Sequence, residues 1–206
     1  MKTVEELKQM CGFAKIIEES NKNFQNLSDA KKRVAIAKDA LEQVLAKKYK
    51  VKTGQYVTFL GSGSPVAKSE ELDVPVACNL QDVKCQVCAR GALFVSALRK
   101  DASIGPEYIS NDENLGNDDI QMTEDQYFSR EQLDLIESAF EVDQFCDDAP
   151  EEMAMAAELY GRSLGNKDER LVAILKNIIR NKGEFVIPEK FIKAGEEKHK
   201  KEMVAY

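Results

Sequence analysis

The chain has 206 residues, which suits one domain, and 43% of them are hydrophobic, which is enough for a packed core and argues against global disorder. It contains no Trp and one His, His199, and a lone His excludes most metal sites and most His-based acid–base mechanisms. The net charge of −7 is unevenly distributed along the chain. Residues 1–100 contain 17 basic and 11 acidic residues, and residues 153–206 contain 11 basic and 8 acidic residues. Residues 101–152, by contrast, contain one basic and 17 acidic residues.

The amino terminus predicts a helix and no export signal. Thr3 and Glu6 fit a capping box, in which each side chain caps a backbone N–H of the other residue. The first ten residues have no apolar segment of the kind that precedes a signal cleavage site. No apolar run in the chain approaches the roughly 20 residues that span a bilayer. We therefore expect a cytoplasmic protein without a membrane partner.

The next elements are a helix and a short strand pair. Ser28 is the expected N-cap of a helix over about 30–48, which has an apolar stripe and a basic opposite face. Residues 49–60 are rich in β-favouring side chains, which predicts a strand at 55–60, paired with 49–52 in a small hairpin.

The third long helix is predicted over about 83–99, with Asp82 as its cap. It is apolar nearly all round, so we expect it in the middle of the domain. Its central apolar residues are predicted to form part of the core: Leu93, Phe94, Val95 and Leu98. Gly91 lowers helix propensity by about 1 kcal/mol relative to Ala, so close packing or a ligand should compensate.

The second half of the chain predicts further helices after a loop at 101–128. Ser129 and Gln132 form a capping-box pair before a helix at 130–142, and Pro150 fits the first turn of a helix to about 163. Asn166 and Glu169 open a last amphipathic helix, with Gly183 just past its end. The expected fold is mainly α (α+β with a small strand or hairpin near 49–60), as one compact multi-helix domain over 1–188 with a charged tail at 189–206.

Four segments together resemble an uncharacterised family of proteins encoded by bacteria and their phages. They are KYKVKTGQY at 48–56, CQVCARGALFVSALRK at 85–100, FSREQLDLIESAFE at 128–141 and ERLVAILKNIIRNKGEF at 169–185. Members of the family carry C-x-V-C-A-x-G-A-L-F, then F-S-x-x-Q-L-x-L-I-E, then a helix ending in N-K-G-E-F. The resemblance implies a small protein of phage or prophage type in the host cytoplasm, and it implies no enzymatic activity.

Three cysteines are weak metal-site candidates. Cys85 and Cys88 form a CxxC with Cys78 seven residues earlier, and thiolates at this spacing bind zinc. A structural zinc site needs a fourth ligand, which the sequence does not supply, so we expect no metal and no cofactor. Buried thiols one turn apart on a helix are the plainer interpretation. A redox pair is a third hypothesis, because Cys85 lies near an expected helix start.

A second candidate site lies beside the 85–99 helix. A small anionic ligand or nucleotide would bind there through four side chains: Tyr56, Arg90, Ser96 and Arg99. The competing interpretation is that the two arginines extend past the core edge to water.

The acidic middle of the chain is a candidate partner-binding surface. Its expected contacts are Asp118, Asp119, Glu124 and Asp125, with further acids at Asp147, Asp148, Glu151 and Glu152. The competing interpretation is a solvated face. The acids fit no EF-hand loop, because Leu115 and Met122 would fall at ligand positions.

No enzyme signature accompanies these features. GSGSP at 61–65 lacks the lysine of a phosphate-binding loop, and no G-x-S-x-G or H-E-x-x-H is present. The sequence thus predicts a non-enzymatic binding protein of phage type that acts on a host component, such as a positively charged protein of a host defence system. The alternative is a small-ligand or nucleotide-binding protein. Nucleic acid is not expected as a partner.

Overall fold

The computed structural model describes residues 21–54, 56–60, 84–101, 126–142 and 149–204. The described elements are three short strands in the first half of the chain and, for the rest, helices. The elements are α2 (Asp29–Leu45), β1 (Tyr49–Val51), β2 (Val57–Leu60), β3 (Lys84–Val87), α4 (Ala89–Lys100), α6 (Arg130–Glu141), α7 (Glu151–Arg162), α8 (Lys167–Arg180) and α9 (Glu189–Val204). The predicted mainly α fold with a small β component is confirmed. The expected helix from Thr3 lies outside the described residues.

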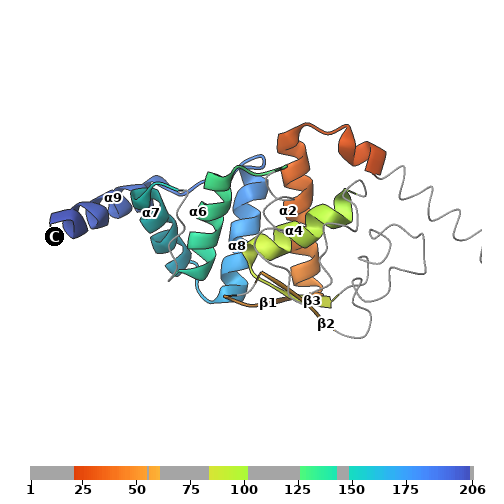
Figure 1. Cartoon of the computed structure of the whole chain (residues 1–206), viewed down its shortest axis with the longest axis horizontal. Coiled ribbons are helices and arrows are strands. Elements are labelled where there is room, and N and C mark those ends of the chain that lie inside the picture. Colours follow the sequence, from red (N-terminus) through yellow and green to blue (C-terminus); the bar gives the residue numbers. More distant parts are fainter. Residues whose placement is uncertain (1–20, 55, 61–83, 102–125, 143–148, 205–206) are drawn as a thin grey trace, which may run out of the picture.

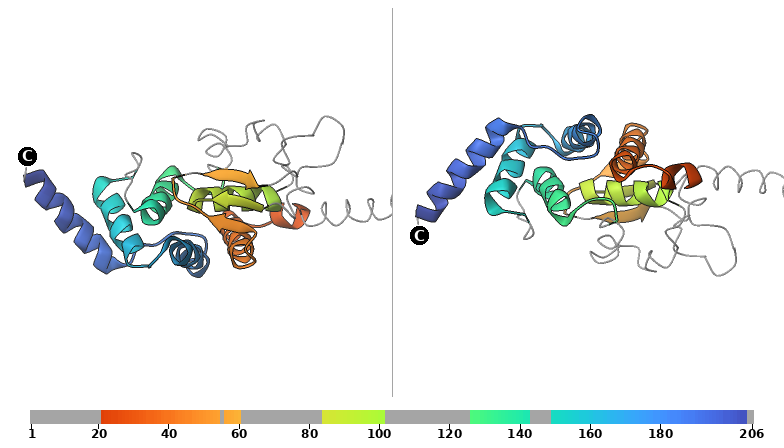
Figure 2. Two further views of the ribbon diagram at one scale, coloured as in Figure 1. Left: turned by 90° about the horizontal axis from the view of Figure 1, so that it is seen from below. Right: turned by 90° about the horizontal axis from the view of Figure 1, so that it is seen from above.

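The helices stand side by side, and the sheet lies across one end of them (Figure 1). α7 packs between α9 and α6, and α6 also contacts α4 and α8. α2 packs against both α4 and α8. Figure 2 shows α9 beyond α7 at one end of the molecule. No helix of the described part of the chain is long and apolar enough to cross a bilayer.

The sheet has the order β1-β3-β2, so the predicted hairpin is wrong. β1 runs parallel to β3, and β2 runs antiparallel to it on the other side. The strand expected at 55–60 is present as β2. The pairing differs because β3 lies between the two predicted strands, although it comes more than 20 residues after β2.

β3 also corrects the start of the third helix. Residues 84–87 alternate between exposed or half-exposed and buried side chains, a strand period that the apolar run conceals. α4 begins only at Ala89, and the thiol of Cys88 caps it by accepting from the backbone N–H of Gly91 at 3.4 Å. Asp82, the expected cap, lies outside the described residues.

α4 is the central helix that the sequence predicts. Every residue from Ala89 to Leu98 is buried, so the predicted core residues are confirmed: Leu93, Phe94, Val95 and Leu98. The glycine in this helix has a packing reason. A Cβ at Gly91 would overlap the backbone carbonyl of Tyr56, so the loop before β2 approaches α4 as only glycine permits.

The carboxyl-terminal helices follow the predicted boundaries. α6 starts after Ser129, whose hydroxyl accepts from the N–H of Gln132 at 3.3 Å. The Gln132 side chain does not complete the capping box. Its amide group instead donates to the backbone carbonyl of Phe185 and accepts from the backbone N–H of the same residue. Pro150 lies at the N-cap of α7, one position before the predicted one. Most of the expected charged tail forms α9, which packs closely on α7 at Gly195.

The cap of α8 supports a stability prediction. The Asn166 side chain accepts from the N–H groups of Asp168 and Glu169, and the Glu169 carboxylate accepts from the N–H of Asn166, so the predicted capping box is confirmed. We expect Asn166→Ala to lower the free energy of unfolding by about 1 kcal/mol. Ser28 caps α2 without a side-chain hydrogen bond, so Ser28→Ala is the control. Equal losses in urea unfolding of the two variants would contradict the prediction.

Candidate functional site

The four predicted ligand contacts lie at two ends of α4. Tyr56 and Arg90 are at its amino-terminal end, and Ser96 and Arg99 are towards its carboxyl-terminal end. The two arginines are nine positions apart on the helix, which corresponds to about 13.5 Å along the axis. The structure therefore forms two polar clusters, one at each end of the helix, in place of one four-residue site.

The amino-terminal cluster is built on Glu137 of α6. One oxygen of its carboxylate accepts from Arg90 Nη1 at 2.8 Å, and the other accepts from the Tyr56 hydroxyl at 3.0 Å. The Arg90 guanidinium also lies over the Tyr56 ring, 5.3 Å from its centroid. The Arg90 side chain is only 7% exposed, so the expectation that it extends to water is wrong. Burial and the nearby Glu137 charge raise the pKa of Tyr56, which keeps its proton on the hydroxyl.

A second carboxylate lies one turn further along α6. Glu141 accepts from the backbone N–H of Gly54 at 2.9 Å. Burial raises the pKa of Glu141 above its usual range, and the Glu137 charge adds to this, whereas the Gly54 N–H opposes it. The cluster thus holds two carboxylates, of which Glu137 pairs with Arg90, and the Arg170 charge also opposes the rise in the pKa of Glu141.

The raised pKa of Glu141 predicts a pH dependence of stability. A folded pKa above the unfolded value of about 4.3 means that the folded state binds the proton more tightly, so stability falls as pH rises from about 4.3 through the folded pKa. Glu141→Gln removes this loss and can still accept from Gly54. We expect urea unfolding to show the variant gaining stability relative to the native chain as the pH rises above about 4.3. Glu131→Gln, at an exposed position of α6, is the control, and an equal gain there would contradict the assignment.

The carboxyl-terminal cluster is built on Asp39 of α2. Its carboxylate accepts from Arg99 Nε at 2.8 Å and pairs with Lys100 Nζ at 3.2 Å. The Asp39 side chain is 3% exposed and that of Arg99 is 8% exposed, so Arg99 does not extend to water either. Ser96 lies beside this pair, with its hydroxyl 3.3 Å from that of Tyr49. Burial raises the pKa of Tyr49, and the nearby Cys85 adds to this.

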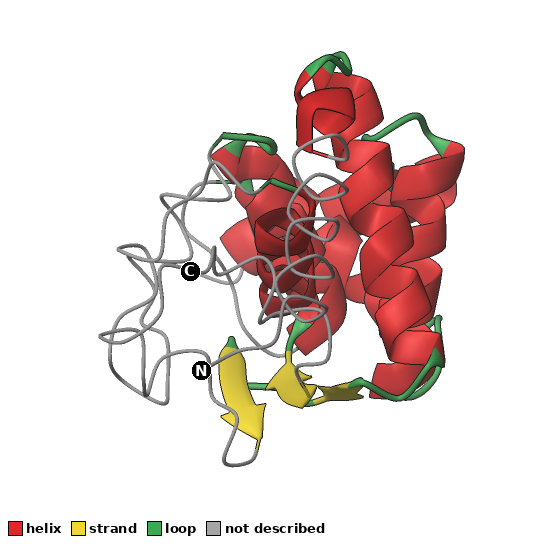
Figure 3. Cartoon of the chain, turned by 90° about the vertical axis from the view of Figure 1, so that its right-hand side faces the viewer, coloured by secondary structure: helices red, strands yellow, loops and turns green. Residues whose placement is uncertain are grey.

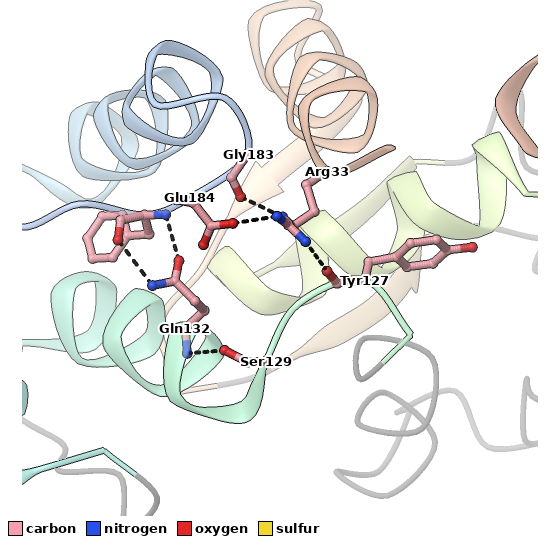
Figure 4. Close-up of polar contacts among 7 residues, drawn as sticks. Arg33, Tyr127, Ser129, Gln132, Gly183 and Glu184 are labelled. Carbon is pink, nitrogen blue, oxygen red and sulfur yellow. Dashed lines mark hydrogen bonds and ion pairs between the residues drawn. The ribbon is translucent and has the colours of Figure 1, made fainter. Parts of the chain in front are cut away.

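A third polar network was not predicted. Arg33 of α2 donates to the carbonyls of Gly183 at 3.0 Å and Tyr127 at 3.2 Å, and it pairs with the Glu184 carboxylate (Figure 4). The Tyr127 hydroxyl in turn donates to Asp101 at the end of α4. These contacts join α2, α4, the start of α6 and the segment after α8.

The partner carboxylates in these clusters have one signal in the sequence. Asp39 follows the buried Ile36 and Ala37 on α2, and Glu137 lies among the buried apolar positions of α6. A charged residue within the apolar stripe of a helix predicts a buried ion pair, although it does not identify the partner.

The cysteines that the structure describes, Cys85 and Cys88, are buried thiols. Cys85 is on β3 and Cys88 is the cap of α4, so they do not lie one turn apart on a helix, although the prediction of buried thiols is confirmed. Burial raises the pKa of the Cys85 thiol to about 12, opposite to the depressed pKa that a redox pair needs. Cys78 lies outside the described residues. Within them, no three His, Cys, Asp or Glu side chains are arranged to hold a metal ion.

The structure places only part of the acidic middle. The four predicted partner contacts, Asp118, Asp119, Glu124 and Asp125, lie outside the described residues, as do Asp147 and Asp148. Glu151 and Glu152 are in the first turn of α7, where the helix dipole favours them. Several other acids of this region are buried inside the fold: Asp101, Asp134, Glu137 and Glu141.

Comparison of the chain with protein-family models, with curated proteins and with solved structures gave no match.

Proposed function

We propose that the chain is a non-enzymatic binding protein of phage or prophage type that acts on a host component through its charged surface. The partner that fits the acidic middle is a positively charged host protein, and a component of host defence is one such target. The acids at 118, 119, 124 and 125 would contact it in the host cytoplasm.

The pairing of both α4 arginines with carboxylates is the observation that carries this proposal. An anionic ligand at the predicted site would bind through Arg90 and Arg99, but these two side chains are hydrogen-bonded to the buried carboxylates of Glu137 and Asp39. Both pairs are buried where α4 meets a neighbouring helix, so they hold α4 in place. The ligand-binding alternative therefore loses its two principal contacts, and binding through the surface charges is favoured.

The surface charge also supports a partner of opposite sign. Residues 101–152 carry 17 acids and one base, and several of these acids are paired or hydrogen-bonded in the core. A high density of like charge along the chain is tolerable in water and favourable beside a basic partner. Such attraction increases the association rate and weakens as salt shortens the Debye length from about 10 Å at 0.1 M to 3 Å at 1 M.

Joint neutralisation of the four proposed contacts tests this function. We expect the Asp118→Asn, Asp119→Asn, Glu124→Gln and Asp125→Asn variant to keep its fold and to lose capture of the host protein that the native chain retains. Capture at rising salt should decline for the native chain and change little for the variant. The measurement is quantitative mass spectrometry of proteins retained from host lysate.

A matched control removes four exposed acids from α9: Glu189→Gln, Glu196→Gln, Glu197→Gln and Glu202→Gln. It changes the net charge equally, so loss of capture in both variants would indicate a general charge effect and contradict the proposed surface. A thermal-shift panel of nucleotides and divalent ions tests the alternative, because a ligand at 100 times its Kd adds about 2.7 kcal/mol to stability.

A further inference from the structure

In the part of the chain that the structure describes, the sheet has helices on one face only. Figure 1 shows α2, α4 and α8 on one side of the strands, and Figure 3 shows the helices on one side of the yellow strands, with no described element on the other. The inward side chains are buried, as the alternation along the strands requires: Tyr49, Val51, Val57, Cys85 and Val87. The outward side chains therefore form a separate surface.

That outer surface is rich in lysine, and we name it the lysine face. Its residues are Lys48, Lys50, Lys52, Thr58, Lys84 and Gln86, together with the exposed Leu60, which pairs with Lys84. Lys50 lies on β1, and Lys48 and Lys52 flank that strand, with backbones that also hydrogen-bond to β3. Lysines thus occupy every second position from 48 to 52, which corresponds to about 6.6 Å along an extended chain. The register places Lys50 beside Gln86, and Gln86 beside Thr58. One residue earlier in the same register, Lys48 lies beside Lys84.

The charge of this face is not balanced within the sheet. β1, β2 and β3 contain no acidic residue, and neither do residues 46–60. Lys50 and Lys84 are exposed, and in the described part of the chain neither forms an ion pair. Lys48 and Lys52 also take part in interactions within the chain, so the test below is built on the other two lysines.

We propose that the lysine face binds an extended acidic peptide segment of a partner protein, with carboxylates at alternate positions. Same-face side chains of an extended peptide repeat at about 6.6 Å, which is the spacing expected of Lys48, Lys50 and Lys52 along β1 and its two flanking residues. Oppositely charged side chains that face each other across strands are mutually stabilising. The proposal goes beyond the proposed function by adding a second surface with its own partner chemistry.

The composition of the face favours carboxylates over nucleic acid. It contains no arginine, whose planar fork binds phosphate with two hydrogen bonds, and no aromatic side chain on which a base could stack. The net charge of −7 also repels a long polyanion, whereas a short peptide needs only the few charges of the sheet.

Fluorescence anisotropy with defined probes tests the proposal. The probes are a labelled octapeptide of alternating Glu and Thr, an octapeptide of the same composition with four Glu followed by four Thr, and an oligothymidylate of equal length. We expect the alternating peptide to bind most tightly at low salt and to dissociate near 1 M salt, where the Debye length is about 3 Å. The double variant Lys50→Gln, Lys84→Gln should weaken its binding by roughly tenfold.

The control variant is Lys190→Gln, Lys193→Gln, which removes two exposed lysines from α9 and leaves the sheet unchanged. Equal weakening by both double variants, equal affinity for the two peptides, or no binding of either peptide would overturn the proposal. Tighter binding of oligothymidylate through Lys50 and Lys84 would also overturn it and assign the face to phosphate. Capture of a host protein through the acidic middle is measured separately, so either proposal can fail while the other stands.

Discussion

Replacing Arg90 with methionine is expected to lower the free energy of unfolding by about 3–5 kcal/mol, measured by urea denaturation. The substitution leaves the Glu137 carboxylate between α4 and α6 without the guanidinium that pairs with it at 2.8 Å. A buried charge that loses its partner costs far more than the pair itself contributes, because its lost hydration is no longer compensated.

The double variant Arg90→Met, Glu137→Met is the matched control. It removes both charges and fills the site with apolar side chains of comparable length, so we expect a much smaller loss than in the single variant. Tyr56 is half buried and can turn its hydroxyl to water. If the double variant is as unstable as the single one, the destabilisation comes from altered packing, and the assignment of a buried ion pair is contradicted.

Truncating Leu98 should destabilise the fold to a similar extent. Leu98 lies on the last turns of α4 and is almost fully buried, so Leu98→Ala should leave a cavity and cost about 2–5 kcal/mol in urea unfolding. The same change at Leu45, at the end of α2, removes a side chain that is 64% exposed and should cost about 0.5 kcal/mol or less. A loss of that small size at Leu98 would show that α4 is not central.

The starts of the helices are predictable because the residues that cap them are close in sequence. Asn166 and Glu169 mark the start of α8 because the cap and the helix are made by neighbouring residues, and the same holds for Ser129 and α6. β3 was missed because a strand of four residues enters directly into an apolar helix, and so short an alternation is not distinguishable from the helical run. The strand pairing was missed because it joins segments that are far apart in the chain.

The sequence predicts the arginines of the candidate site but not the residues that pair with them. Arg90 and Arg99 are identifiable from sequence as charges in an apolar helix, but their function depends on what lies opposite them. Asp39 is 60 residues from Arg99, and Glu137 is 47 residues from Arg90, so only the packing of α2 and α6 against α4 reveals the pairs. These pairs indicate that the two arginines serve primarily to hold the helices together.

The strand order also determines when the sheet can form. During synthesis the chain emerges amino terminus first, so β1 and β2 leave the ribosome before β3, which lies between them. The pairing of Tyr49 with Cys85 closes a loop of 36 residues. The conformational entropy of that loop must be lost before any hydrogen bond between β1 and β3 is gained. Until residue 87 has emerged, β1 and β2 have no sheet to join, and α2 is the only complete described element against which they can collapse. We therefore expect late, concerted appearance of the sheet, with α2 forming ahead of it.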